Sequence, residues 1–266
     1  MIKLTDLLKE IKTTPKAIIM AGGASVGKST VLNTLNPLLK DFINLNADKY
    51  VEDKNSPMYG NLSAASSQIK KIDFPNTVNN RQNLIYDTTA SNLTTLQPML
   101  DELNSAGYNT MMIMVYAHPI ISFLRNFKRE RKVPVVGVLG TWVNVYNLLE
   151  EYKQIFGKNF ILVSSQPTTS EEQQAINNFE QAYKQGTLQE YFADLLSSGK
   201  FSSTFKKDDS DLSPEELAKK EKQRLKSKEV LHKTIDKISD TYESIQSELD
   251  PIDLKELPNK VKTFIG

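Results

Sequence analysis

The chain has 266 residues and a formal net charge of +1, from 33 basic and 32 acidic side chains, so overall charge does not point to nucleic acid or an anionic membrane as a partner. It contains no cysteine, which excludes disulfides, thiolate metal sites and cysteine nucleophiles. Residues 1–10 lack the apolar core of a signal peptide, and no run of about 18 apolar residues occurs, so we expect a cytoplasmic protein without a membrane span.

Short apolar segments alternate with helical patterns along the first two thirds of the chain. The run Ala17–Ala21 is continuously apolar and is followed by glycines, as in a strand that is buried on both faces. Strands are predicted at 17–21, 42–45, 83–87, 110–117 and 160–163. Helices are predicted at 2–12, 28–39, 93–103, 119–132, 135–156 and 171–198, with one or two more in the polar segment 46–80. This order predicts an α/β fold with a five-stranded, mainly parallel sheet and helices on both faces.

The pattern changes towards the C-terminus, and we place a domain boundary near residue 200. Residues 1–200 would form the α/β domain and residues 201–266 an α-helical extension. A helix start is predicted at Ser213-Pro214, because serine caps helices and proline favours their first position. An apolar stripe follows on this helix, formed by Leu231, Ile235, Ile238, Tyr242, Ile245 and Leu249. The stripe predicts packing on the body of the chain, on a protein partner or on a second copy.

The basic residues at the start of that extension form a second feature. They are Lys219, Lys220, Lys222, Arg224, Lys226, Lys228 and Lys233. Such a stretch could contact nucleic acid phosphates, although aromatic residues for base stacking are absent there. A solvated helix is the alternative interpretation.

A phosphate-binding loop is predicted directly after the first strand. Residues 22–29, GGASVGKS, fit the pattern G-x-x-x-x-G-K-[ST]. Glycines let the backbone N–H groups point at phosphate oxygens, and the following helix adds its positive end. The predicted nucleotide-binding residues are Gly22, Gly23, Ala24, Ser25, Val26, Gly27, Lys28, Ser29 and Thr30. Lys28 would contact the β- and γ-phosphates of ATP, and Ser29 would bind Mg²⁺.

Two aspartates end predicted strands, where the active groups of a parallel sheet gather. Asp48 follows the second strand and is a candidate general base that accepts a proton from a substrate hydroxyl; its alternative role is to cap the next helix. Asp87 ends the third strand, as in a Walker B element that holds Mg²⁺. It could instead position the substrate or Asp48, or simply form a turn.

The predicted helix 119–132 is strongly basic. Arg125, Arg129 and Lys132 would share one face of it, with Arg131 offset. Guanidinium groups bind phosphate oxygens in bidentate fashion, so a lid carrying these arginines could close over ATP. The alternative is a solvated basic face or a nucleic-acid patch.

Together these strings resemble the zeta-toxin and polynucleotide-kinase branch of the P-loop kinases. The matching pieces are GGASVGKST at 22–30, NADK at 46–49, IYDTTA at 85–90 and LRNFKRERKVP at 124–134. The resemblance implies the nucleotide-kinase-like P-loop fold. It also implies that Asp48 is the general base, that Arg125, Arg129 and Arg131 are lid arginines, and that Thr88 and Thr89 contact the substrate. The adenine pocket would involve Arg125 and residues 164–167.

The function implied by this resemblance is ATP-dependent transfer of the γ-phosphate to a hydroxyl group. The acceptor would be a nucleotide, a nucleic acid 5′ end or a small metabolite. The alternative is a P-loop ATPase that acts as a switch or assembly factor through its C-terminal helix on a protein partner. A third interpretation is a nucleic-acid binder that uses the basic stretches.

Overall fold

The computed structural model of the chain describes residues 14–198 and 214–266. The helix predicted at 2–12 and the predicted domain boundary near residue 200 lie outside these residues. So do the side chains of Lys219, Lys220, Lys222 and Arg224. Within the described ranges, no helix is both long and apolar enough to cross a membrane.

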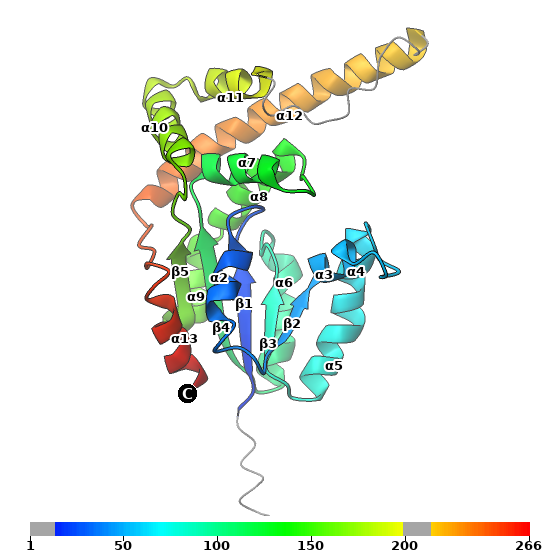
Figure 1. The fold of residues 1–266 in the computed structure, drawn as a ribbon, viewed down its shortest axis with the longest axis vertical. Coiled ribbons are helices and arrows are strands. Elements are labelled where there is room, and N and C mark those ends of the chain that lie inside the picture. The colour runs from blue at the N-terminus through cyan, green and yellow to red at the C-terminus, as the bar shows by residue number, and fades with distance from the viewer. Residues whose placement is uncertain (1–13, 199–213) are drawn as a thin grey trace, which may run out of the picture.

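A five-stranded sheet forms the centre of the molecule (Figure 1). Its strands are β1 (Lys16–Ala21), β2 (Ile43–Asn46), β3 (Leu84–Asp87), β4 (Asn109–Tyr116) and β5 (Phe160–Ser164). Their order is β2-β3-β1-β4-β5, and all four neighbouring pairs are parallel. The predicted α/β fold is therefore confirmed, with β1 at the centre of the sheet.

The crossovers explain why helices cover both faces of this sheet. The chain moves from β1 to β2 in one direction and from β3 to β4 in the other. Since β-α-β crossovers are right-handed, the connecting helices α2 (Lys28–Leu35) and α6 (Leu93–Ser105) lie on opposite faces. The central strands β1 and β4 are buried on both sides, which accounts for their continuous apolar sequences.

The segments after β2 and β4 are divided into more helices than predicted, since one or two were expected in 46–80 and one in 135–156. The segment after β2 forms α3 (Ala47–Glu52), α4 (Leu62–Gln68), the π-helical turn η1 (Ile69–Asp73) and α5 (Phe74–Asn79). The predicted helix 135–156 is two helices, α8 (Val135–Tyr146) and α9 (Leu149–Phe156), followed by the 3₁₀ turn η2 (Gly157–Asn159). At the break between these two helices, the side chain of Asn147 accepts a 2.9 Å hydrogen bond from the Thr241 hydroxyl, so a distant part of the chain packs there.

The predicted basic helix also ends early. The helix α7 spans Pro119–Lys128, and Arg129 already has an extended backbone. Two hydrogen bonds between Asn126 and Val133, together called the clamp, hold the chain in this conformation. The buried Asn126 side chain donates to the carbonyl of Val133 at 2.8 Å and accepts from the N–H of Val133 at 2.9 Å. Arg129 and Arg131 therefore lie on a turn, and the prediction that Arg125, Arg129 and Lys132 share one helical face is wrong.

The C-terminal helices pack on the body of the chain. Beyond α10 (Ser170–Gln185) and α11 (Leu188–Ser197) come α12 (Pro214–Gln246) and α13 (Leu257–Ile265). Figure 1 shows α12 running across the end of the molecule towards which the strands point, with α7 and α8 between it and the sheet. The stripe residues Ile235, Ile238, Tyr242 and Ile245 are buried in the same core as the strands, and Leu231 and Leu249 pack against it. This stripe thus covers the chain's own body.

Candidate active site at the carboxyl ends of the strands

A cleft of about 620 Å³ lies at the carboxyl ends of the central strands. Its lining brings together the predicted site residues Ala24, Ser25, Val26, Gly27, Lys28, Ser29, Asp48, Asp87, Thr88, Thr89, Arg125, Arg129 and Arg131. These residues come from four separate stretches of sequence, which the sheet order makes neighbours. A cavity of this size matches that of small-molecule sites. The other predicted residues of the phosphate-binding loop, Gly22, Gly23 and Thr30, do not line the cleft.

The phosphate-binding loop has a backbone that requires its glycines. Gly22 has a φ of 142°, and a Cβ atom there would lie 2.8 Å from the carbonyl oxygen of Val115. Gly27 has a φ of 101° and is the N-cap of α2, without any side chain that caps the helix. The positive end of α2 therefore faces the cleft without an acidic group in its first turn, which suits an anionic ligand.

Lys28 lies inside this loop. Its Nζ donates to the carbonyl oxygens of Gly22 and Gly23, at 2.9 and 3.4 Å. Burial lowers the pKa of Lys28, while the charges of Asp87 and Asp48 act in the opposite direction. Both carboxylates are therefore close enough to interact with the lysine, and the loop's backbone holds the ammonium in position.

The two aspartates are joined through Asn46. Asn46 donates from Nδ2 to Oδ2 of Asp87 at 2.8 Å, and its Oδ1 accepts from the N–H of Asp48 at 2.8 Å. Burial raises the pKa of Asp87 above its usual value, against the charge of Lys28. Asp48 follows Asn46 in α3 and is about one-third exposed. Asn46, to which the sequence had assigned no role, thus positions both carboxylates.

A buried carboxylate whose pKa is raised gains from a nearby cation, so the surroundings of Asp87 fit Mg²⁺. Ser29 supplies a hydroxyl that lines the same cleft. The described residues contain no cluster of three acidic or histidine side chains that would hold a metal alone. One carboxylate and one hydroxyl are sufficient when nucleotide phosphates and water supply the other ligands.

The two threonines that the sequence predicts to contact the substrate follow Asp87. The N–H of Thr88 donates to the carbonyl of Met20 at 3.0 Å, and the carbonyl of Thr89 accepts from Gly22 at 3.2 Å. The Thr89 hydroxyl lies 3.1 Å from that of Ser91. These bonds hold the strand end against the phosphate-binding loop, with both threonines lining the cleft.

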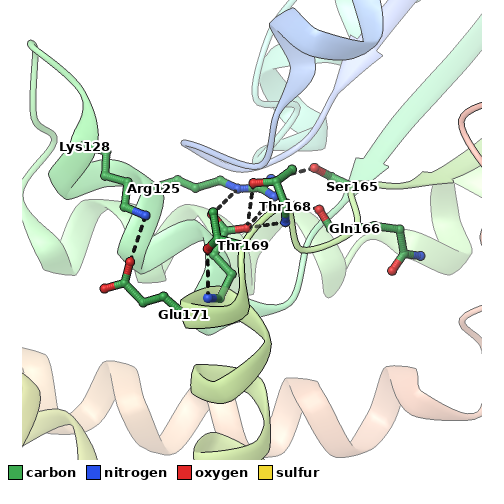
Figure 2. A network of polar contacts seen from close by, with 8 residues as sticks. Arg125, Lys128, Ser165, Gln166, Thr168, Thr169 and Glu171 are labelled. Atoms are coloured by element: carbon green, nitrogen blue, oxygen red, sulfur yellow. Dashed lines mark hydrogen bonds and ion pairs between the residues drawn. The ribbon is translucent and has the colours of Figure 1, made fainter.

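The arginines contact different parts of the site. Arg131 donates to Oδ1 of Asp48 at 3.1 Å, and Arg129 donates to the hydroxyl of Ser25 at 3.4 Å. The turn after α7 therefore spans the cleft, from the phosphate-binding loop to the candidate base. Arg125 instead contacts Glu172, Ser165 and the backbone of Gln166 (Figure 2).

Sequence reasoning missed several residues of this site. Thr141 on α8 accepts from the N–H of Ala24 at 3.3 Å, although its helix carries only an apolar pattern in sequence. Glu172 follows Thr169 by three residues, which is the sequence signature of a helix cap. Thr169 does cap α10 by accepting from the N–H of Glu172, but the Glu172 carboxylate contacts Arg125. The cap signature could have predicted the start of α10 near this residue, but it gives no indication of the contact with Arg125.

Comparison with known proteins agrees with the geometry. A sequence model described as zeta toxin matches residues 4–140, just over half of the chain. None of the curated protein sequences compared with the chain matches it.

Solved structures with a similar arrangement have low sequence identity. A chain from the PezAT chromosomal toxin–antitoxin system of Streptococcus pneumoniae is 13% identical, with a TM-score of 0.46 over 64% of this chain and 82% of that one. A chain of the Pnkp1/Rnl/Hen1 RNA repair complex is 18% identical, with a TM-score of 0.45 over 54% of this chain and 48% of that one. Shikimate kinase from Acinetobacter baumannii is 16% identical, with a TM-score of 0.37 over 68% of this chain and 98% of that one. The family match covers the phosphate-binding loop, both aspartates and the arginine turn, and the chain belongs to the zeta toxin family.

Proposed function

We propose that the protein is an ATP-dependent kinase that transfers the γ-phosphate to a hydroxyl group of a small molecule or of a nucleic acid 5′ end. The observation that carries the proposal is the contact between Arg131 and Asp48 across the cleft. A cation that could bind phosphate and a carboxylate that could accept a proton thus meet in the cleft that Lys28 also lines, which supports the proposal. Phosphoryl transfer depends mainly on such positioning and charge stabilisation.

The positions of the residues support the following roles. The phosphate-binding loop and Lys28 hold the β- and γ-phosphates. Asp48 accepts the proton of the acceptor hydroxyl as its oxygen bonds to the γ-phosphorus and the bond to the β–γ bridging oxygen breaks, releasing ADP. Arg129 and Arg131 stabilise the charge on the transferred group.

Mg²⁺ would be held by Ser29 and Asp87, and when bound it neutralises charge on the phosphate oxygens. Thr88 and Thr89 are proposed to contact the acceptor, because they line the cleft beside Asp87. The adenosine would lie on the opposite side of the loop, near Arg125 and residues 164–167.

The test is transfer of label from γ-labelled ATP to a panel of acceptors. The panel contains 5′-hydroxyl DNA and RNA, nucleosides, nucleotides and UDP-sugars. One class is expected to be labelled, with Asp48→Asn reducing the rate by about 10²–10⁴-fold while ATP still binds. Lys28→Ala is expected to abolish labelling, because it removes the phosphate contact.

Release of phosphate that is unchanged in Asp48→Asn, with no acceptor labelled, would overturn the kinase proposal. It would favour the alternative of an ATPase switch. A switch that works through the apolar stripe of α12 would have to release that helix from the core, since the stripe is buried there.

A further inference from the structure

Arg125 donates four hydrogen bonds within the protein, so its guanidinium is not free to move with a bound phosphate group. Its Nε and Nη2 donate to the two carboxylate oxygens of Glu172 at 3.1 and 3.0 Å. Nη1 donates to the hydroxyl of Ser165 at 2.6 Å, and Nη2 also donates to the carbonyl of Gln166 at 2.8 Å. Three edges of the guanidinium are thus occupied, while its side chain still lines the cleft.

Glu172 is the centre of this network. Its side chain is 3% exposed, and besides Arg125 it accepts from the N–H and the hydroxyl of Thr168, at 2.9 and 3.3 Å. One carboxylate therefore ties together α7, the loop after β5 and the first turn of α10. Figure 2 shows these elements converging on Arg125.

The network lies directly against the phosphate-binding loop. A Cβ atom on Gly27 would be 2.8 Å from the hydroxyl of Ser165 and 3.5 Å from Nη1 of Arg125. Ser165 is itself held by a 2.7 Å bond from its N–H to the carbonyl of Tyr116 at the end of β4. The position of Arg125 relative to the phosphate-binding loop is consequently set through Ser165 and the end of β4.

The sheet order indicates which part of a bound ATP molecule would lie beside Arg125 and Ser165. Asp48 follows β2 and Asp87 ends β3 on one side of β1, whereas Arg125 and Ser165 follow β4 and β5 on the other. An acceptor hydroxyl must approach Asp48, so the nucleoside must leave the phosphates on the side of β4 and β5. The flat face of a guanidinium stacks on aromatic rings, including nucleobases.

We infer that Glu172 is a positioning residue for the nucleoside half of ATP. It holds the Arg125 guanidinium and residues 165–168 as a fixed wall for the base, and it does not contact the phosphates. The inference rests on the proposed function, because that function supplies ATP as the ligand. Without the Glu172 carboxylate, the protein should bind the phosphate chain normally and the nucleoside poorly.

The test compares two ligands that share phosphates and differ in the nucleoside. Calorimetry measures the Kd of ATP and of inorganic tripolyphosphate, both with Mg²⁺, for the wild type and for Glu172→Gln. We expect the Kd of ATP to rise about tenfold, the effect of losing a charged hydrogen bond, and that of tripolyphosphate to stay within about twofold. The ratio of the two constants separates positioning of the nucleoside from general damage to the site.

Glu171→Gln is the matched control. Glu171 neighbours Glu172 on α10 and pairs with Lys128 of α7 at 3.1 Å, but both side chains are more than half exposed (Figure 2). It bridges the same two helices without contacting the loop after β5. Neither Kd is expected to change in this variant.

An unchanged Kd for ATP in Glu172→Gln, or an equal loss for both ligands, would overturn the inference. If Glu172→Gln does not fold, Ser165→Ala decides by the same ratio, because it removes one bond to Arg125 and leaves the ion pair. A wild type that binds ATP but labels no acceptor would count against the kinase and leave this ratio interpretable. If the wild type transfers label, but the ratio of the two Kd values in Glu172→Gln and in Ser165→Ala equals that of the wild type, the result would count against the role of Glu172 alone.

Discussion

Two arginine–carboxylate pairs connect the segment 125–131 to the rest of the site, and they differ in burial and in bonding. Arg125 and Glu172 share two hydrogen bonds, with side chains 18% and 3% exposed. Arg131 and Asp48 share one contact of 3.1 Å, with side chains 37% and 39% exposed. The arginine of each pair lines the cleft, yet only the first pair is largely buried.

This difference has an energetic basis. Water screens a half-exposed pair, which contributes about 0–1 kcal/mol, so its members can separate at little cost. Removing one member of a buried pair leaves an uncompensated charge, which costs several kcal/mol. The pair at Asp48 can therefore open when phosphates compete for Arg131, whereas the pair at Glu172 remains a fixed part of the site.

The largest expected effect on stability comes from Glu172→Ala. It leaves the Arg125 guanidinium without its carboxylate in a largely buried position, and we expect the free energy of unfolding to fall by about 3 kcal/mol. Urea unfolding measures it. Asp48→Ala is the control for the exposed pair, with an expected change below about 1 kcal/mol. Equal losses in the two variants would contradict the contrast between the pairs.

A smaller effect is expected for Asn126→Ala, which removes the clamp between the fixed and the exposed pair. Two hydrogen bonds to the backbone of Val133 are lost, so we expect about 2 kcal/mol lower stability and slower phosphate transfer, because Arg131 is no longer held near Asp48. Thermal unfolding and the labelling assay measure the two effects. Asn178→Ala changes an exposed asparagine on α10 and should have little effect on either measurement.

The smallest effect on stability is expected from lowering the pH, because protonation removes the charge of Glu172 and leaves its side chain in place. Burial alone would raise the pKa of Glu172, but the bonds from Arg125 and Thr168 outweigh it and lower that pKa. A carboxyl whose pKa is lowered by folding stabilises the protein above its unfolded pKa, about 4.3, and loses that contribution as the pH falls through the folded value.

The stability difference between the wild type and Glu172→Gln should therefore be constant near neutral pH and shrink in acid. Unfolding temperatures recorded from pH 7 to pH 3 test this expectation. A difference that is independent of pH would mean that the Glu172 charge does not contribute to the pair.

The sequence was most informative where function and fold impose local patterns. The loop at 22–29, the buried strands and the aspartates at strand ends could all be identified, because parallel strands are continuously apolar and their carboxyl ends carry the active groups. Helix ends were less predictable. The end of α7 at Lys128 depends on the side-chain contact of Asn126 with Val133 beyond the helix, and the break at Asn147 coincides with a contact to the distant Thr241, so periodicity predicted neither.

The sequence by itself thus determined the class of fold, the position of the phosphate-binding loop and most of the charged residues at the cleft. Tertiary structure alone decided how these residues pair: Arg131 with Asp48, Arg125 with Glu172, and the stripe of α12 with the body of the protein. The physical reason is distance along the chain. Periodicity and capping operate over a few residues, whereas these pairs join residues 47 or 83 positions apart, which only the folded sheet and its crossovers bring together.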